Sequence, residues 1–201
     1  MSRYNKSRTF PIALVLIIVA VAIAALISVT RAIFFSGDNQ STTQTDVSQD
    51  ALISTAADRE VRMTVRGAIV ANEDFHSYLI AITPSSRVLS AYTGYMDKNV
   101  DQQVGLGNNI PAYEELVYAL SRANLVKGTE LTDDQNDTRG ICATGLLYRF
   151  EILKNNRPVK NLWTSTCKGS KGSLDASVDQ LKALFIAQIP DAPSRISKID
   201  L

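Results

Sequence analysis

The feature that most constrains this chain is a long uncharged segment near its N-terminus. From Phe10 to Thr30, 21 consecutive residues carry no charge, and most of them are Ile, Val, Leu or Ala. Because a helix rises about 1.5 Å per residue, roughly 20 such residues cross the hydrocarbon core of a bilayer. We therefore predict a transmembrane helix over residues 10–35, with the lipid bilayer as its partner.

Basic residues predict the orientation of this helix. Arg3, Lys6 and Arg8 precede the segment, whereas only Arg31 follows it closely. Positive charge accumulates on the cytoplasmic side of membrane helices, so residues 1–9 are predicted to form a cytoplasmic leader and the rest of the chain to lie outside the cytoplasm. A cleavable signal peptide is the alternative, but its apolar region typically spans about 7–15 residues. We predict an uncleaved signal-anchor in a single-pass membrane protein.

The charge and composition of the chain argue against several classes of ligand and site. The 201 residues carry 21 Lys and Arg against 20 Asp and Glu, but residues 1–31 hold four of the basic residues and no acid. The rest of the chain therefore has a net charge of −3, which argues against nucleic acid or anionic lipid as a ligand. One histidine and two cysteines leave little room for a multi-histidine or four-cysteine metal site. A hydrophobic content of 45% indicates a folded protein rather than a disordered one.

Composition divides the chain beyond the anchor into three parts. Residues 36–58 are mostly small and polar, with aspartates interspersed, which predicts a flexible linker. Residues 59–190 have the size of one globular domain. Residues 191–201 contain Pro193 and several charges, and we predict that they form a loose C-terminal tail.

Periodicity within residues 59–190 predicts an α+β domain. Five segments alternate apolar and polar residues as half-buried strands do, and two segments carry apolar residues at helical spacing. The order is β-β-β-α-β-β-α, and the short turns favour an antiparallel sheet of about five strands with both helices on one face. Ser173 is the predicted cap of the last helix, which Pro190 ends. The predicted strands are centred on residues 61–65, 78–82, 88–92, 146–152 and 159–167, and the first predicted helix begins at Pro111.

The two cysteines flank the last predicted hairpin on opposite strands. If the turn lies at Asn155-Asn156, Cys167 comes opposite or next to residues 143–144, within disulfide reach of Cys142. The predicted location outside the cytoplasm is oxidising, so such a bond would form and persist. We predict a structural disulfide between Cys142 and Cys167 rather than a redox pair, because the chain has no C-x-x-C spacing.

One acidic cluster is a candidate calcium site. Asp133, Asp134, Asn136 and Asp137 lie within five residues, and calcium binds about six to eight oxygens. The cluster does not fit the EF-hand template, because Gly140 comes one position late and no glutamate closes the loop. Such residues are also typical of solvated turns. We predict a turn here, with calcium as the alternative, and no cofactor.

No set of residues with a catalytic spacing is evident in the sequence. His76, the only histidine, lies at the entry to a predicted strand, where Asp74 and Ser77 are too near in sequence to imply triad geometry. Residues 165–168 match the S-x-x-K motif, but they lie at the end of a strand and the accompanying S-D-N and K-T-G motifs are missing. We predict that the protein is not an enzyme. An envelope hydrolase or transferase is the alternative, and it would require a polar pocket around His76.

A candidate binding surface lies at the ends of the strands. Tyr92 and Tyr95 flank a glycine turn, and Thr164 and Thr166 occupy outward positions of the last strand. Exposed tyrosines bind partners, although half-buried strand ends also carry them. Threonines suit a wet sheet face or an edge that is open to a partner strand. These residues predict contact with a protein or an envelope polymer.

Three blocks of the sequence carry a resemblance to a group of bacterial proteins. The blocks are Thr138–Gly145, Leu162–Cys167 and the ending from Leu184 to Pro190. Together with the short basic leader, they resemble small, N-terminally anchored membrane proteins of Saccharibacteria-type bacteria. The resemblance implies a single-pass bacterial protein with its C-terminal domain outside the cytoplasm. It implies no catalytic residue and no ligand.

The sequence therefore predicts a membrane-tethered binding or structural module of the cell envelope. The alternative is an accessory subunit of a secretion, pilus or other membrane assembly, because small residues such as Ala20 and Ala24 would let partner helices pack against the anchor. Exchange of the anchor for an unrelated helix separates the two. A tethered module tolerates the exchange, whereas a subunit of an assembly does not.

Overall fold

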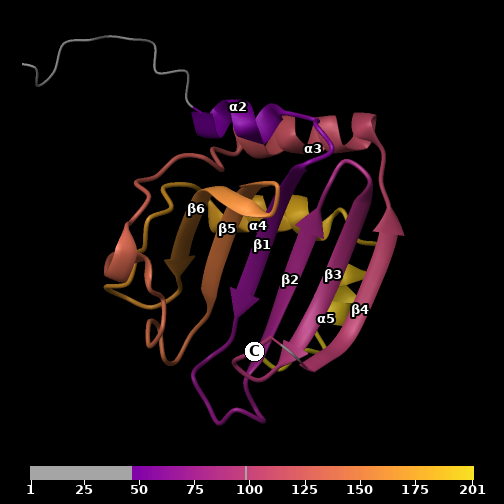
Figure 1. Cartoon of the computed structure of the whole chain (residues 1–201). Helices are drawn as coiled ribbons and strands as arrows, with labels where there is room; N and C mark the ends of the chain where they lie inside the picture. The colour runs from indigo at the N-terminus through magenta and orange to yellow at the C-terminus, as the bar shows by residue number, and fades with distance from the viewer. Residues whose placement is uncertain (1–46, 98) are drawn as a thin grey trace, which may run out of the picture. The chain divides into compact units, whose positions relative to one another are not determined.

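The computed structural model describes residues 47–97 and 99–201 (Figure 1). The predicted membrane anchor at residues 10–35 and the first part of the predicted linker at residues 36–58 lie outside the described residues. Within the described ranges, no helix is both long and apolar enough to cross a bilayer. The anchor therefore stays a prediction.

The centre of the fold is a six-stranded antiparallel sheet with the strand order β4-β3-β2-β1-β5-β6. The first strand in sequence thus lies inside the sheet and joins its two halves. The predicted α+β class and antiparallel sheet are confirmed. The strands are β1 (Arg59–Arg66), β2 (His76–Ile82), β3 (Ser86–Thr93), β4 (Asn99–Gly107), β5 (Leu147–Lys154) and β6 (Arg157–Ser165). The helices are α2 (Val47–Ile53), α3 (Ile110–Arg122), α4 (Val178–Ile186), α5 (Ala192–Ile196) and the short 3-10 helix η1 (Asp133–Asn136).

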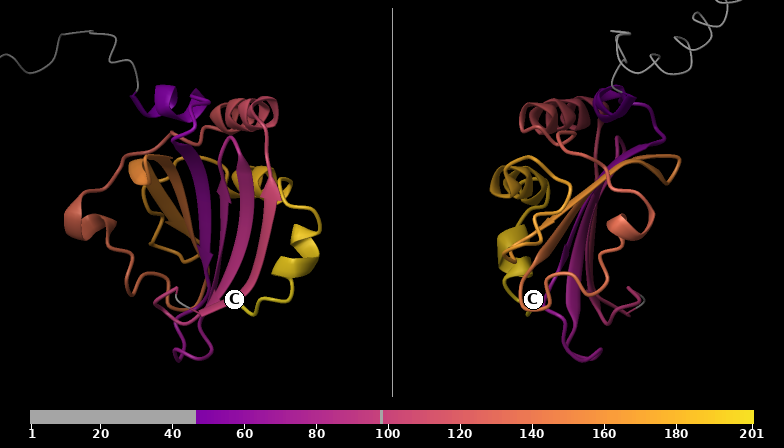
Figure 2. Two further views of the ribbon diagram at one scale, coloured as in Figure 1. Left: turned by 45° about the vertical axis from the view of Figure 1, so that its right-hand side comes forward. Right: turned by 90° about the vertical axis from the view of Figure 1, so that its left-hand side faces the viewer.

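Alternation along the strands gives the sheet two different faces. On β1, Val61, Met63 and Val65 are buried, and the residues between them are half-buried. Helices α3, α4 and α5 lie on the side of the buried residues (Figure 2). We call the opposite side the open face, because no α-helix among the described residues covers it. The segment 129–145, which contains η1 and is called the arm below, passes over this open face (Figure 2).

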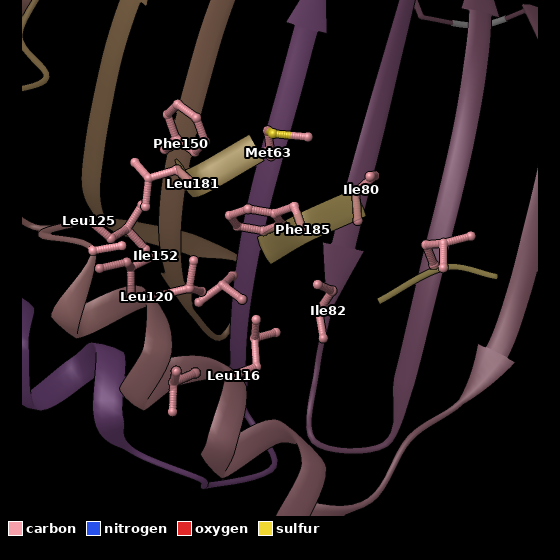
Figure 3. Packing of buried hydrophobic residues seen from close by; sticks show 14 of the residues in the cluster. Met63, Ile80, Ile82, Leu116, Leu120, Leu125, Phe150, Ile152, Leu181 and Phe185 are labelled. Carbon is pink, nitrogen blue, oxygen red and sulfur yellow. The ribbon is translucent and has the colours of Figure 1, made fainter. Parts of the chain in front are cut away.

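The hydrophobic core lies between the sheet and the helices (Figure 3). Met63 sits in register between Ile80 of β2 and Phe150 of β5. Phe150 in turn contacts Phe185 of α4, with ring centroids 6.0 Å apart. Burial of an apolar side chain of this size contributes about 1.5–3 kcal/mol. Helix α3 adds four buried residues at the predicted helical spacing: Tyr113, Leu116, Val117 and Leu120.

Strand β4 is missing from the predicted set of about five strands. It pairs with β3 along its length, from Ser86↔Gly107 to Thr93↔Asn99, and all of its residues are exposed or half-buried. Two glycines, an asparagine and an aspartate give the segment a low strand propensity. Pairing with β3 therefore places these residues in the sheet, and the two apolar residues on its core side, Val104 and Leu106, are too few to predict a strand.

Two short helices lie where the sequence predicted a linker and a loose tail. Helix α2 falls within residues 36–58, and its Ala51 and Leu52 are buried in the core. Helix α5 falls within residues 191–201, and its Ala192 is fully buried. For these residues the two predictions are wrong. Helices of seven and five residues are too short to produce a recognisable period in the sequence.

The predicted cap of the last helix is also wrong. Helix α4 begins after Ser177, whose hydroxyl accepts a hydrogen bond from the Gln180 amide. Ser173 is buried instead, and its hydroxyl accepts a hydrogen bond from the Trp163 amide at 3.0 Å. The amides of Ser173 and Leu174 both donate to the Trp163 carbonyl. The segment before α4 therefore covers the edge of β6, which would otherwise present unpaired backbone groups.

Two buried tyrosines make the stability of the domain sensitive to high pH. Burial raises the pKa of Tyr78 on β2 and of Tyr113 on α3 above the ordinary value of 10.0. The unfolded chain ionises these phenols at their ordinary pKa while the folded chain keeps them neutral, so the free energy of unfolding falls as the pH rises above about 10. We expect the urea midpoint of Tyr78→Phe to fall less between about pH 9 and pH 11 than that of the wild type. Equal slopes for the two proteins would contradict this expectation.

Candidate functional site

A cleft of about 720 Å³ lies on the open face of the sheet. Its floor is made by side chains of β1, β2, β3 and β5, and its walls by residues 138–139 of the arm and by the turn after β3. We call it the arginine cleft, because four arginines line it against two carboxylates. They are Arg62, Arg66, Arg139 and Arg149, with Asp97 and Glu151.

Strand periodicity places two of these arginines side by side. On β1, the residues that alternate with the core are Arg62, Thr64 and Arg66, so their side chains lie on the open face. On β5, Arg149 occupies the same face, opposite Thr64 in the register. Arg66 lies opposite Leu147, two residues away. Arg66 and Arg149 are therefore diagonal neighbours, a relation within the reach of long side chains.

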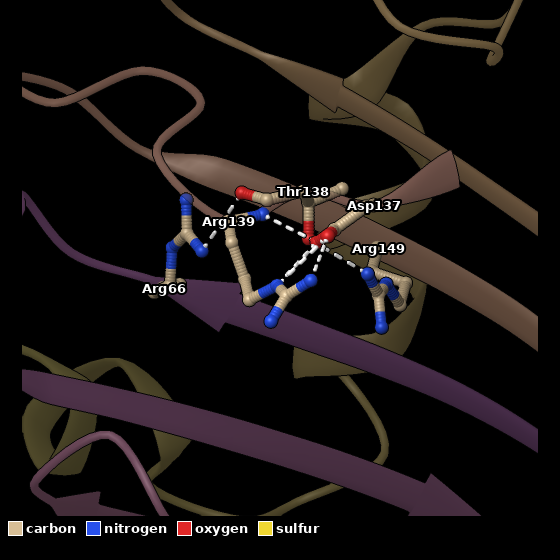
Figure 4. Close-up of polar contacts among 5 residues, drawn as sticks. All are labelled: Arg66, Asp137, Thr138, Arg139 and Arg149. Carbon is tan, nitrogen blue, oxygen red and sulfur yellow. Dashed lines mark hydrogen bonds and ion pairs between the residues drawn. The ribbon is translucent and has the colours of Figure 1, made fainter. Parts of the chain in front are cut away.

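Both of these arginines bind the same residue of the arm (Figure 4). Arg66 donates from Nη1 to the Thr138 carbonyl at 3.1 Å and from Nη2 to the Ile141 carbonyl at 2.7 Å. Arg149 donates from Nη2 to the Thr138 hydroxyl at 2.8 Å. The arm thus holds two guanidinium groups together through Thr138, which is buried.

Arg66 and Arg149 lack a direct carboxylate partner among the described residues, and the Asp137 carboxylate, which Arg139 binds, interacts with the charge of Arg149 without an ion pair. Neither forms an ion pair there, and burial together with the charge of Arg149 lowers the pKa of Arg66. The Nε atom of each is buried and has no hydrogen-bond partner in the described part of the chain. An unpaired buried donor costs about 1–3 kcal/mol, and more when it is charged. The two arginines therefore form a site that an anion would stabilise.

The other two arginines of the cleft are neutralised by carboxylates. Arg62 lies 2.7 Å from Glu60 and 3.9 Å from Glu151. Arg139 donates from Nε to Asp137 at 2.7 Å, and its hydrogen bonds lower the pKa of the Asp137 carboxyl to about 2. Asp137 and Glu151 are thus paired with Arg139 and Arg62, so the positive charge that remains in the cleft is concentrated at Arg66 and Arg149.

The other half of the cleft is apolar and aromatic. Phe75 is buried and stacks on Tyr95, with ring centroids 3.9 Å apart and planes at 19°. Tyr95 is 43% exposed, and its hydroxyl donates to the Val70 carbonyl at 2.7 Å. Leu79 of β2 and Tyr92 of β3 continue this surface on the floor of the cleft. We call these four residues the aromatic half of the cleft: Leu79, Phe75, Tyr92 and Tyr95.

The four residues of the predicted binding surface fall in different places. Tyr92 and Tyr95 line the arginine cleft. Thr164 lies opposite Tyr148, a core residue, and therefore on the face away from the cleft. Thr166 lies beside the disulfide, where its hydroxyl accepts a hydrogen bond from the Leu146 amide at 3.0 Å. The structure therefore does not bring the tyrosines and threonines together on one surface.

The acidic cluster and the histidine do not join the arginine cleft as a metal or catalytic set. Residues 133–136 form η1, and the Asp137 carboxylate is bound by Arg139. The described residues contain no group of three or more His, Cys, Asp or Glu that could hold a metal ion. His76 begins β2 next to Ser77, whose side chain faces the cleft, so His76 lies on the other side of the sheet.

The predicted disulfide is confirmed. Cys142 and Cys167 are bonded, with their Cα atoms 5.3 Å apart. The bond ties the end of the arm to the chain just after β6. Gly145 lies so close to it that an added Cβ would come within 3.2 Å of both sulfur atoms. The disulfide therefore anchors the segment whose carbonyl groups position Arg66.

The arginine pair itself is not among the residues that the sequence predicted for binding. Arginine at alternate positions of a strand is ordinarily typical of a solvated face. The available signal was that Arg66 and Arg149 lie on the polar positions of two predicted strands, but their pairing depends on the strand order. Comparisons with family models, curated proteins and solved structures give no match for the chain.

Proposed function

We propose that this protein is a membrane-tethered, extracytoplasmic binding module of the cell envelope, whose ligand presents an anionic group to Arg66 and Arg149. The observation that carries this proposal is the pair of half-buried guanidinium groups, neither of which forms an ion pair with a described residue. A guanidinium binds carboxylate and phosphate groups through parallel N–H···O bonds. A cleft of about 720 Å³ is within the size range of small-molecule sites.

The tether in this proposal comes from the apolar segment at residues 10–35 and the basic leader before it. The Cys142–Cys167 disulfide supports a location outside the cytoplasm, because such bonds persist in oxidising compartments. Retention of the full chain in membranes after alkaline extraction tests the tether. Release into the soluble fraction would contradict it.

The mildly acidic charge beyond the anchor is compatible with this ligand. A net charge describes the field far from the protein, whereas a small ligand meets the local charge of the cleft. Arg66 and Arg149 therefore suit a small anion better than a long polyanion, which would also meet the net negative charge of the chain beyond the anchor.

Thermal unfolding of the full chain in mild detergent tests the anion site. Trp163, the only tryptophan, reports unfolding by its fluorescence. Acetate, phosphate and 3-phenylpropionate are titrated at constant ionic strength against sodium chloride. At ten times its dissociation constant, a bound ligand raises the free energy of unfolding by about 1.4 kcal/mol. We expect at least one of the three anions to raise the unfolding temperature of the wild type.

Matched arginine variants show whether the stabilisation comes from the cleft. We expect Arg66→Gln and Arg149→Gln to need a ligand concentration at least tenfold higher than the wild type for the same rise in unfolding temperature, because each variant removes half of the guanidinium pair. Arg157→Gln, which removes an exposed arginine at the start of β6, should respond as the wild type does. Equal responses of all four proteins, or no response to any of the anions, would contradict the proposed function.

A further inference from the structure

We propose that the ligand of the arginine cleft is an amphiphilic monocarboxylate. Its carboxylate would lie against Arg66 and Arg149, and its apolar or aromatic group against the aromatic half of the cleft. This inference rests on the proposed function, because it names the chemical class of the anion that the cleft binds.

The hydrogen-bonding groups that remain on the arginine pair favour a carboxylate. The Thr138 and Ile141 carbonyls and the Thr138 hydroxyl occupy three of the terminal N–H groups. The remaining terminal N–H groups, two on Arg66 and three on Arg149, have no partner in the described part of the chain. A carboxylate offers two oxygens to such a pair, and each charged hydrogen bond is stronger than a neutral one.

The apolar part of the ligand is inferred from what lies beside the arginines. Arg66 is opposite Ser77 of β2, and Ser77 is opposite Tyr92 of β3, so the Tyr92 ring lies two strands from Arg66. Leu79 lies on the intervening strand. Adjacent strands are about 4.8 Å apart, so about 10 Å separates the arginine from the tyrosine strand. A carboxylate joined through a short linker to one ring has this length.

A purely inorganic anion or a purely apolar ligand would use only part of the cleft. An inorganic anion would leave the exposed face of Tyr95 and the floor at Tyr92 in water. An uncharged apolar ligand would cover Arg66 and Arg149 without providing a counter-charge, at a high cost in desolvation. An amphiphilic carboxylate would provide the counter-charge for the arginine pair and would also cover the aromatic half of the cleft.

The carboxylates of the cleft argue against a second negative group on the ligand. Asp97 lines the aromatic side, where the Ser77 hydroxyl donates to it at 3.3 Å, and Glu151 lines the side of β5. A dicarboxylate that spans the cleft would bring its second charge towards Asp97. Repulsion between the two therefore favours a ligand with one negative charge.

A set of three small molecules tests this inference on the full chain in mild detergent. Acetate carries the charge alone, 2-phenylethanol carries the ring alone, and 3-phenylpropionate carries both. We expect the dissociation constant of 3-phenylpropionate to be at least tenfold lower than that of either of the other two. The binding is measured by the shift of the unfolding temperature and by isothermal titration calorimetry.

Variants of the aromatic half separate the two parts of the ligand. We expect Tyr92→Ala and Leu79→Ala to raise the dissociation constant of 3-phenylpropionate at least fivefold. The dissociation constant of acetate should stay unchanged in both variants. Tyr118→Ala, a tyrosine that is 45% exposed on α3 and does not line the cleft, is the matched control. Two variants are used because either one alone could lose binding through impaired folding. Circular dichroism checks that each variant is folded.

The outcomes distinguish this inference from the proposed function. Equal affinity for acetate and 3-phenylpropionate, with both lost in Arg66→Gln, overturns the amphiphilic ligand and leaves the anion site intact. Equal affinity for 3-phenylpropionate and 2-phenylethanol shows that the carboxylate is not recognised, and it overturns both. Tight binding of 3-phenylpropionate that needs both Arg66 and Tyr92 supports both.

Discussion

Replacement of both cysteines, in Cys142→Ser/Cys167→Ser, is expected to lower the free energy of unfolding by about 3 kcal/mol. The disulfide closes a loop with a sequence separation of 25 residues, so its loss gives the unfolded chain many additional conformations. The loss is measured by urea unfolding of the full chain in detergent. The wild type in reducing buffer should show the same loss, and the double variant should not respond to reductant.

This variant also tests how the arm supports the arginine cleft. The arm carries the Thr138 and Ile141 carbonyls that accept hydrogen bonds from Arg66, and Cys142 follows them directly. We expect anion binding to weaken in the double variant even under conditions where it remains folded. A wild-type urea midpoint that reductant leaves unchanged would contradict the stabilising role of the disulfide.

Phe185→Ala is expected to destabilise the protein by about 3–5 kcal/mol. Phe185 on α4 is fully buried and packs against Phe150 of the sheet, so truncation removes apolar contacts and leaves a cavity between the two layers. The change is read from the urea midpoint. Tyr118→Ala, on the exposed side of α3, should shift the free energy of unfolding by no more than about 0.5 kcal/mol.

The same substitution separates stability from ligand binding. Phe185 packs on the covered face of the sheet, whereas Arg66 and Arg149 lie on the open face. Below its unfolding temperature, Phe185→Ala should therefore bind 3-phenylpropionate with the wild-type dissociation constant. A loss of less than about 1 kcal/mol in stability would show that the contact with Phe150 is not a main part of the core.

The sheet shows how much of the fold follows from local pattern. In residues 61–66 of β1 and 148–152 of β5, apolar residues alternate with polar ones, as predicted, and the apolar set is buried. In β4 only Val104 and Leu106 pack against the core, and the strand forms because β3 offers it a hydrogen-bonding partner. Strands that fully bury one face can be predicted from sequence, whereas two half-buried apolar residues on an edge strand are too few to predict one.

The binding residues divide in the same way. Tyr92 and Tyr95 were predicted as a surface, because aromatic residues next to a glycine turn are noticeable in the sequence. The contact of Arg66 with Thr138 joins residues 72 positions apart, and no motif spans that separation. Thr164 and Thr166 do not belong to this surface. The direction of their side chains depends on the register of β6, and a shift of one residue reverses it.

The sequence by itself determined the α+β class, the antiparallel sheet and the pairing of Cys142 with Cys167. These features depend on periodicity, turn residues and spacing, all of which are local properties of the chain. The tertiary structure alone decided that α2 and α5 pack on the domain, that β4 completes the sheet and that the arm crosses the open face. It also brought together Arg66 and Arg149, neither of which forms an ion pair with a described residue, because their proximity depends on strand order and on hydrogen bonds to a distant segment.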